Sequence, residues 1–76
     1  MAQIPEFLTP EMWLQQVFGS AEALKGGVVK RQIRDVERLV GREAFARAVK
    51  RRGFQAVENG RYFVIFCNDH PIRRLR

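Results

Sequence analysis

The chain has 76 residues, of which 46% are hydrophobic and 29% are charged. This composition is typical of a folded soluble domain and argues against wholesale disorder. The length excludes a (β/α)₈ barrel, which needs roughly 200 residues or more, and a doubly wound fold built from several βαβ units of about 30 residues each. We therefore expect one small domain over residues 1–68 and a basic, flexible tail over residues 69–76.

The positive charge is unevenly distributed along the chain. The net charge is +6, yet no basic residue precedes Lys25, and the segment before it carries −3 from Glu6, Glu11 and Glu22. The rest of the chain therefore carries +9. Such an asymmetry is typical of a protein whose partner is a polyanion, above all a nucleic acid. The same charge would also keep a small protein in solution.

The sequence favours a cytoplasmic location. Cys67 is the only cysteine, so no internal disulfide can form and nothing indicates an oxidising compartment. No basic stretch followed by an apolar run stands at the N-terminus, as a secretory signal requires. No apolar run approaches the roughly 18 residues of a membrane span, so we expect no membrane contact.

The first predicted helix has a well-marked start. Thr9 is a suitable N-cap and Pro10 fits the first helical position. Leu8 can pack against the fourth helical residue as a hydrophobic staple, and Gly19 ends the helix. The apolar stripe of this helix consists of Trp13, Leu14, Val17 and Phe18. A short helical turn is expected over residues 21–25, ending at the next glycine pair.

Residues 28–40 allow two predictions. Apolar residues at positions 29, 33, 36 and 40 are spaced four, three and four apart, as in a helix. However, two β-branched residues directly after Gly26-Gly27 also suit a short strand near Val28, with Asp35 capping a helix that begins at Val36. We favour the strand.

A basic helix is expected over residues 42–52. Its last turn carries three cations, which complement the negative end of the helix dipole, and Gly53 serves as the C-cap. The inner stripe of this helix consists of Ala44, Phe45, Ala48 and Val49.

A β-hairpin is the strongest local signal. Asn59-Gly60 separates two β-rich runs, at residues 54–58 and 61–66, and suits a type I′ turn. A two-residue loop there would place Glu58 opposite Arg61. Both faces of the second run are apolar, so we expect this strand to be central or covered on both sides, with the segment near Val28 as its neighbour. The predicted fold class is therefore α+β: N-terminal helices, a basic helix and a C-terminal hairpin, extended to a three-stranded sheet if residues 28–31 form a strand.

Nucleic acid is the partner that the sequence favours. A helix, a turn at Gly41, a basic helix and a hairpin follow one another as in a helix-turn-helix module with a wing. However, Glu37 stands four residues before the turn glycine, where such modules usually have a small residue. Tyr62 and Phe66 share one hairpin face and would suit base stacking if exposed, although rings in a short chain are more often core. The expected phosphate contacts are Arg42, Arg47, Lys50, Arg51, Arg52 and Arg61.

A protein-interaction module or homodimer is the alternative. In that case the N-terminal helix would present its apolar stripe (Trp13, Leu14, Val17 and Phe18) to a partner, and the positive charge would serve only solubility. Packing of the same stripe into the core of its own chain is the competing expectation.

No catalytic constellation is expected. Cys67, Asp69 and His70 lie within four residues, but the chain has a single cysteine and a single histidine. They fall short of the three or four ligands of a zinc site, and a thiolate pair requires a surrounding pocket. Gly26-Gly27 lacks the flanking pattern of a phosphate-binding loop. We predict a non-enzymatic protein with no metal and no cofactor.

Four segments together resemble a group of short bacterial proteins of about 75 residues. They are Gly26-Gly27-Val28-Val29, Arg34-Asp35-Val36-Glu37-Arg38, Arg51-Arg52-Gly53-Phe54 and Phe63-Val64-Ile65-Phe66-Cys67-Asn68. Some members of the group bear the label phosphoribosylanthranilate isomerase, the name of a barrel enzyme that uses a Cys base and an Asp acid. A chain of this length cannot close a barrel. The resemblance therefore implies a compact domain and leaves its activity open.

Overall fold

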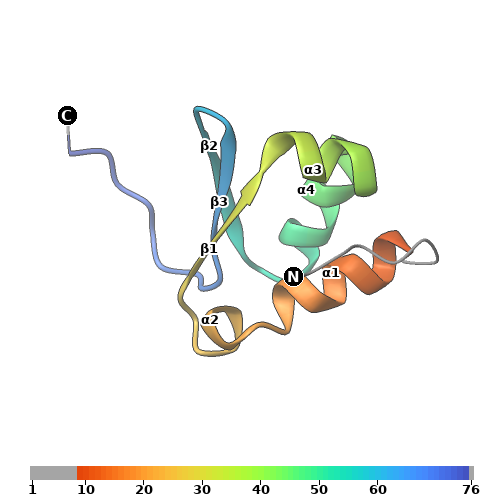
Figure 1. Cartoon of the computed structure of the whole chain (residues 1–76). Helices are drawn as coiled ribbons and strands as arrows, with labels where there is room; N and C mark the ends of the chain where they lie inside the picture. The colour runs from red at the N-terminus through yellow and green to blue at the C-terminus, as the bar shows by residue number, and fades with distance from the viewer. Residues whose placement is uncertain (1–8, 76) are drawn as a thin grey trace.

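The computed structural model describes residues 9–75, so the predicted Leu8 staple lies outside the described residues. Two short helices precede a strand, two further helices follow it, and a hairpin completes the fold (Figure 1). In chain order the elements are α1 (Pro10–Phe18), α2 (Ala21–Leu24), β1 (Val28–Gln32), α3 (Ile33–Leu39), α4 (Arg42–Arg51), β2 (Gln55–Asn59) and β3 (Tyr62–Phe66).

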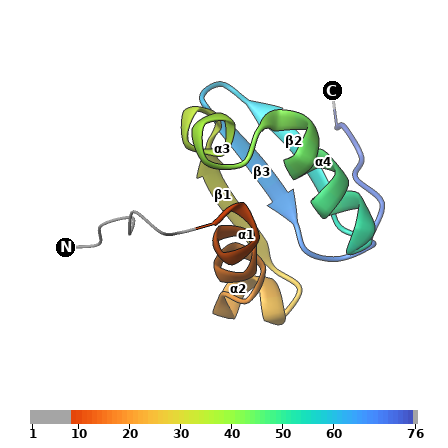
Figure 2. The same ribbon diagram turned by 90° about the vertical axis from the view of Figure 1, so that its right-hand side faces the viewer.

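The strands form one antiparallel sheet in the order β1-β3-β2. The helices α1, α3 and α4 lie on one side of this sheet (Figures 1 and 2). The α+β class, the strand near Val28 and the central position of the second hairpin strand are thereby confirmed.

The two N-terminal helices both begin at side-chain caps, and the cap of the first is the predicted Thr9. The Thr9 hydroxyl accepts a hydrogen bond from the Met12 N–H at 3.1 Å, and Pro10 occupies the first helical position. The Ser20 hydroxyl accepts from the Ala23 N–H at 3.4 Å and starts α2. These caps satisfy backbone donors that the first helical turn leaves free.

Helix α3 begins three residues earlier than predicted. It starts at Ile33, and Asp35 lies within its first turn instead of capping it. The Ile33 N–H donates to the Arg61 carbonyl at 2.8 Å, so strand pairing continues up to the first helical residue. This cross-strand bond satisfies one of the backbone donors that the first helical turn leaves free.

The hairpin register is shifted by two residues from the prediction. Asn59 pairs with Tyr62, so the turn is centred on Gly60 and Arg61. Gly60 has φ of +60°, and none of the described non-glycine residues has a positive φ. A type I′ turn would need a positive φ at both central residues, whereas type II′ needs it only at the first, where the glycine stands. A shift of two keeps every side chain on its predicted face.

Helix α4 ends one residue before the predicted terminus, with Arg52 as its C-cap. The next residue, Gly53, has φ of +74°. Its N–H donates to the Lys50 carbonyl at 2.9 Å, and the Phe54 N–H donates to the Val49 carbonyl at 3.1 Å. This pair of bonds is a Schellman motif, which favours glycine at the left-handed position.

The core lies between the helices and the inner face of the sheet. Its centre is an aromatic cluster in which Phe45 contacts the rings of Trp13, Phe18 and Phe63. The inner face contributes Val29, Phe63 and Ile65, all buried. The N-terminal helix therefore packs into the core of its own chain.

The other face of the sheet, which we call the open face, has no helix against it among the described residues (Figure 1). Because successive strand side chains alternate between the two faces, the open face consists of Val28, Lys30 and Gln32 from β1, Tyr62, Val64 and Phe66 from β3, and Gln55, Val57 and Asn59 from β2. Val28 is 52% exposed and Val57 38%. Residues 69–75 form neither helix nor strand: the His70 carbonyl accepts from the Gln55 side chain of the open face at 2.6 Å, and the chain beyond it leaves the sheet on this side (Figure 1).

Candidate nucleic-acid interface

Helix α4 presents a stripe of cations to solvent. Its buried residues are Phe45, Ala48 and Val49, so the helical period places Arg47, Lys50 and Arg51 on the outer side. All three are exposed, and none has an ion-pair partner among the described residues. Three of the six predicted phosphate contacts therefore form one surface, which we call the α4 stripe.

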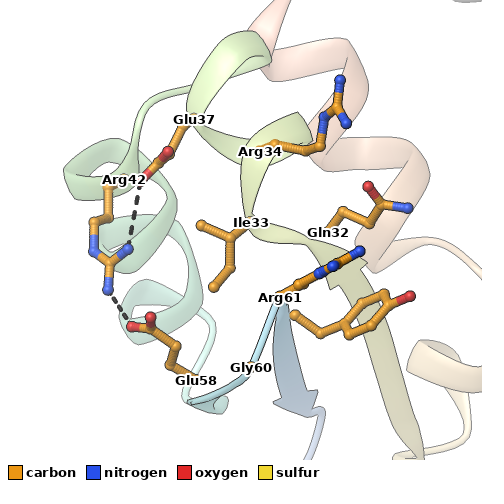
Figure 3. A pocket seen from close by; sticks show the side chains of 9 residues that line it. Gln32, Ile33, Arg34, Glu37, Arg42, Glu58, Gly60 and Arg61 are labelled. Atoms are coloured by element: carbon orange, nitrogen blue, oxygen red, sulfur yellow. Dashed lines mark hydrogen bonds and ion pairs between the residues drawn. The ribbon is translucent and has the colours of Figure 1, made fainter.

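Arg42 is engaged within the protein. Its guanidinium donates to the carboxylates of Glu37, at 3.4 Å, and of Glu58 (Figure 3). It also lies over the Phe63 ring, 5.1 Å from the centroid. The hydrogen bond and the charge of Glu58, and then those of Glu37, raise the pKa of Arg42. This cation therefore links α3, α4 and β2, and its charge is largely compensated.

Arg52 is also engaged in packing. Its guanidinium lies 4.4 Å from the centroid of the Phe18 ring and donates to the Ala48 carbonyl at 3.1 Å. A cation over an aromatic face is stabilised by the ring quadrupole. The side chain thus covers the aromatic cluster at the end of α4 in addition to carrying charge.

The two ends of α4 differ in charge. Three carboxylates, those of Glu37, Glu43 and Glu58, lie on or beside its first turn, where Arg42 is the only cation of the helix. The cations gather instead in its second half. Helix α3, the turn and α4 do precede the hairpin in helix-turn-helix order, but such modules read bases with the N-terminal residues of the second helix. The α4 stripe suits phosphate contacts better than groove reading.

A hollow of about 580 Å³ lies between the hairpin turn and the start of α3 (Figure 3). The side chains of Gln32, Arg34 and Arg61 lie on one side of it, and the network of Arg42 with its two carboxylates lies on the other. Arg34 and Arg61 have no ion-pair partner among the described residues.

The sequence did not predict Arg34 and Gln32 as site residues. Both fall in the segment that allowed either a strand or a helix, and only the strand-to-helix change at Ile33 brings them beside Arg61. Their closeness depends on strand pairing between residues about 30 positions apart, which no local pattern encodes.

The apolar stripe of the alternative hypothesis lies mostly inside the protein. Trp13, Val17 and Phe18 are each less than one-tenth exposed, and Leu14 is partly buried against the core. In this conformation these side chains offer a partner little surface.

The thiol of Cys67 is buried with 4% exposure, whereas Asp69 and His70 are exposed. Burial raises the pKa of Cys67, the opposite of what a thiolate nucleophile requires. Over residues 9–75 no group of three or more His, Cys, Asp or Glu side chains could hold a metal ion.

The buried thiol makes stability dependent on pH. Because the pKa of Cys67 is higher in the folded chain, we expect its contribution to be constant below the unfolded pKa of about 8.5 and to decline above it, where only the unfolded chain ionises. Urea unfolding at about pH 7 and about pH 9.5 should show a larger loss for the wild type than for Cys67→Ala. Equal losses in the two proteins would contradict this expectation.

Comparison of the chain with protein-family models, curated proteins and solved structures finds no match. The resemblance to short bacterial proteins therefore stays a prediction. Within the described part of the chain, no helix combines the length and the apolar character needed to cross a membrane.

Proposed function

We propose that this protein is a small non-catalytic domain that binds nucleic acid through phosphate contacts. The observation that supports the proposal best is the α4 stripe: Arg47, Lys50 and Arg51 stand together on one exposed helix face, and no carboxylate of residues 9–75 is paired to them. Arg61, on the hairpin turn, adds a fourth cation of the same kind. Such cations attract a polyanion and replace the counterions that surround its phosphates.

Two of the predicted contacts fall outside the proposed surface. Arg42 is held by Glu37 and Glu58, and Arg52 is packed on Phe18. A phosphate would have to displace these interactions before it could pair with either guanidinium. The proposal therefore rests on four cations.

The salt dependence of binding tests the proposal. If four phosphates are neutralised, the logarithm of the association constant should fall with the logarithm of salt concentration at a slope of about −3.6 for duplex DNA or about −2.8 for a single strand. Fluorescence anisotropy with labelled oligonucleotides measures this slope directly. A slope near zero, or no binding at low salt, would contradict the proposal.

A further inference from the structure

The open face has fewer charged side chains than the composition of the chain would lead one to expect. The chain as a whole is 29% charged, yet the open face carries one charged side chain, Lys30, and no carboxylate. Two aromatic residues of the central strand, Tyr62 and Phe66, lie on it and are partly exposed. A face that combines aromatic rings with positive charge and excludes negative charge suits a ligand with flat rings and phosphates.

Tyr62 has polar neighbours on both sides. The register places Gln32 on one side of it and Asn59 on the other. Lys30 extends its ammonium over the Tyr62 ring, 4.5 Å from the centroid, so a base that stacks on this ring face must displace the ammonium toward its own phosphate. Amide side chains carry both hydrogen-bond donors and acceptors, as the edges of nucleobases do. A base stacked on Tyr62 would therefore meet two groups that can bond its edge.

Two arginines close to the Tyr62 ring can contact the phosphate of the same nucleotide. Tyr62 lines the hollow at the hairpin turn together with Arg34 and Arg61. At about 580 Å³, the hollow falls within the range of small-ligand sites, about 300–1,000 Å³. The tail also leaves the sheet on the open-face side and carries Arg73 and Arg74 (Figure 1).

The size of the face argues against a second copy of the chain as its occupant. Three strands of five residues cover roughly 14 by 17 Å, or about 240 Å². A stable dimer buries about 800 Å² on each partner. The face of a four-stranded sheet can stack two or three bases on its aromatic side chains. A three-stranded face of this size therefore has room for about two bases.

We infer that the open face binds an unpaired base of a single-stranded nucleic acid at Tyr62, with Arg34 and Arg61 on the adjoining phosphate. The inference rests on the proposed function and names its substrate class. A duplex cannot occupy this site, because its bases are stacked on one another and present no free ring face to Tyr62.

Nuclear magnetic resonance of Tyr62 gives a direct test, because it is the only tyrosine in the chain. Addition of a short oligothymidylate should shift the Tyr62 ring signals, since a stacked base places them in its ring current. The indole signal of Trp13, which is 8% exposed in the core, serves as the internal reference and should move little. A blunt-ended duplex without a loop, which has no unpaired base, should leave the Tyr62 ring signals in place.

Variants extend the test to affinity. Tyr62→Ala should weaken binding of the single strand by about 5- to 150-fold, as loss of one stacked base does, whereas Tyr62→Phe should bind nearly as well as the wild type. Arg34→Ala provides a second variant, because this side chain is exposed and not part of the core. With Arg34 as a fifth phosphate contact, the single-strand salt slope of the wild type should be about −3.5, and Arg34→Ala should bring it to about −2.8.

The outcomes separate the inference from the proposed function. Salt-sensitive binding that depends on the α4 stripe but leaves the Tyr62 ring unmoved, or equal effects of Tyr62→Ala on duplex and single strand, would overturn the inference alone. Concentration-dependent self-association that Tyr62→Ala abolishes would also overturn it. Absence of salt-sensitive binding to any nucleic acid would overturn both.

Discussion

Phe45→Ala is expected to destabilise the domain by about 3–5 kcal/mol, the usual result of removing a buried ring. Phe45 is 2% exposed. Its ring centroid lies 6.4 Å from that of Trp13, 6.3 Å from Phe18 and 5.4 Å from Phe63. The substitution removes three aromatic contacts and leaves a cavity where α1, α4 and β3 meet. A domain of this size has a total stability of roughly 4–11 kcal/mol, so much of it would be lost.

Urea unfolding followed by the fluorescence of Trp13, the only tryptophan, measures this loss. Leu24→Ala is the matched control, because Leu24 is 76% exposed and its truncation should change stability by no more than about 0.5 kcal/mol. A loss below about 1 kcal/mol for Phe45→Ala would mean that the aromatic cluster does not hold the helices on the sheet.

The triple variant Arg47→Ala, Lys50→Ala, Arg51→Ala is expected to remove most of the binding to nucleic acid. These cations supply three of the four proposed phosphate contacts. If each releases its share of counterions, the duplex salt slope should change from about −3.6 to about −0.9, with the affinity at low salt falling most. The side chains lie outside the core, so the fold should be retained.

A variant with Lys25, Arg31 and Arg38 replaced by alanine is the matched control. It also removes three charges from the net +6, but from the C-cap of α2, from β1 and from α3 instead of the outer face of α4. If binding depends on net charge alone, the two triple variants should behave alike. If it depends on the α4 stripe, the control should keep a slope close to that of the wild type. Similar losses in both variants would contradict the assignment of phosphate contacts to α4.

Features that depend on neighbouring residues could be predicted from the sequence. The cap at Thr9, the proline after it and the glycine at position 53 act within one helical turn, so the local pattern contains the whole interaction. The apolar period of residues 44–49 placed Phe45 inside for the same reason. The hairpin was predicted from its Asn-Gly pair, although its turn is centred one residue later.

Features that depend on pairing between distant segments required the tertiary structure. The bond from Ile33 to the Arg61 carbonyl moved the start of α3. The contacts of Arg42 with Glu37 and Glu58 removed a predicted phosphate contact from the α4 stripe. The contacts of Ile33 with Arg61 and of Arg42 with Glu58 join residues that lie 28 and 16 positions apart, and no pattern of nearby residues records them.

Outside residues 28–40, the sequence by itself determined the elements, and it also determined the basic character of α4 and the two apolar faces of β3, because helix and strand periods assign each residue a side within its own element. Only the tertiary structure decided which apolar face receives the helices and which stays open, and which cations meet a carboxylate. An exposed side chain and a buried one can be chemically identical. The difference lies in what packs against them, and that is set by contacts between parts of the chain that are far apart in sequence.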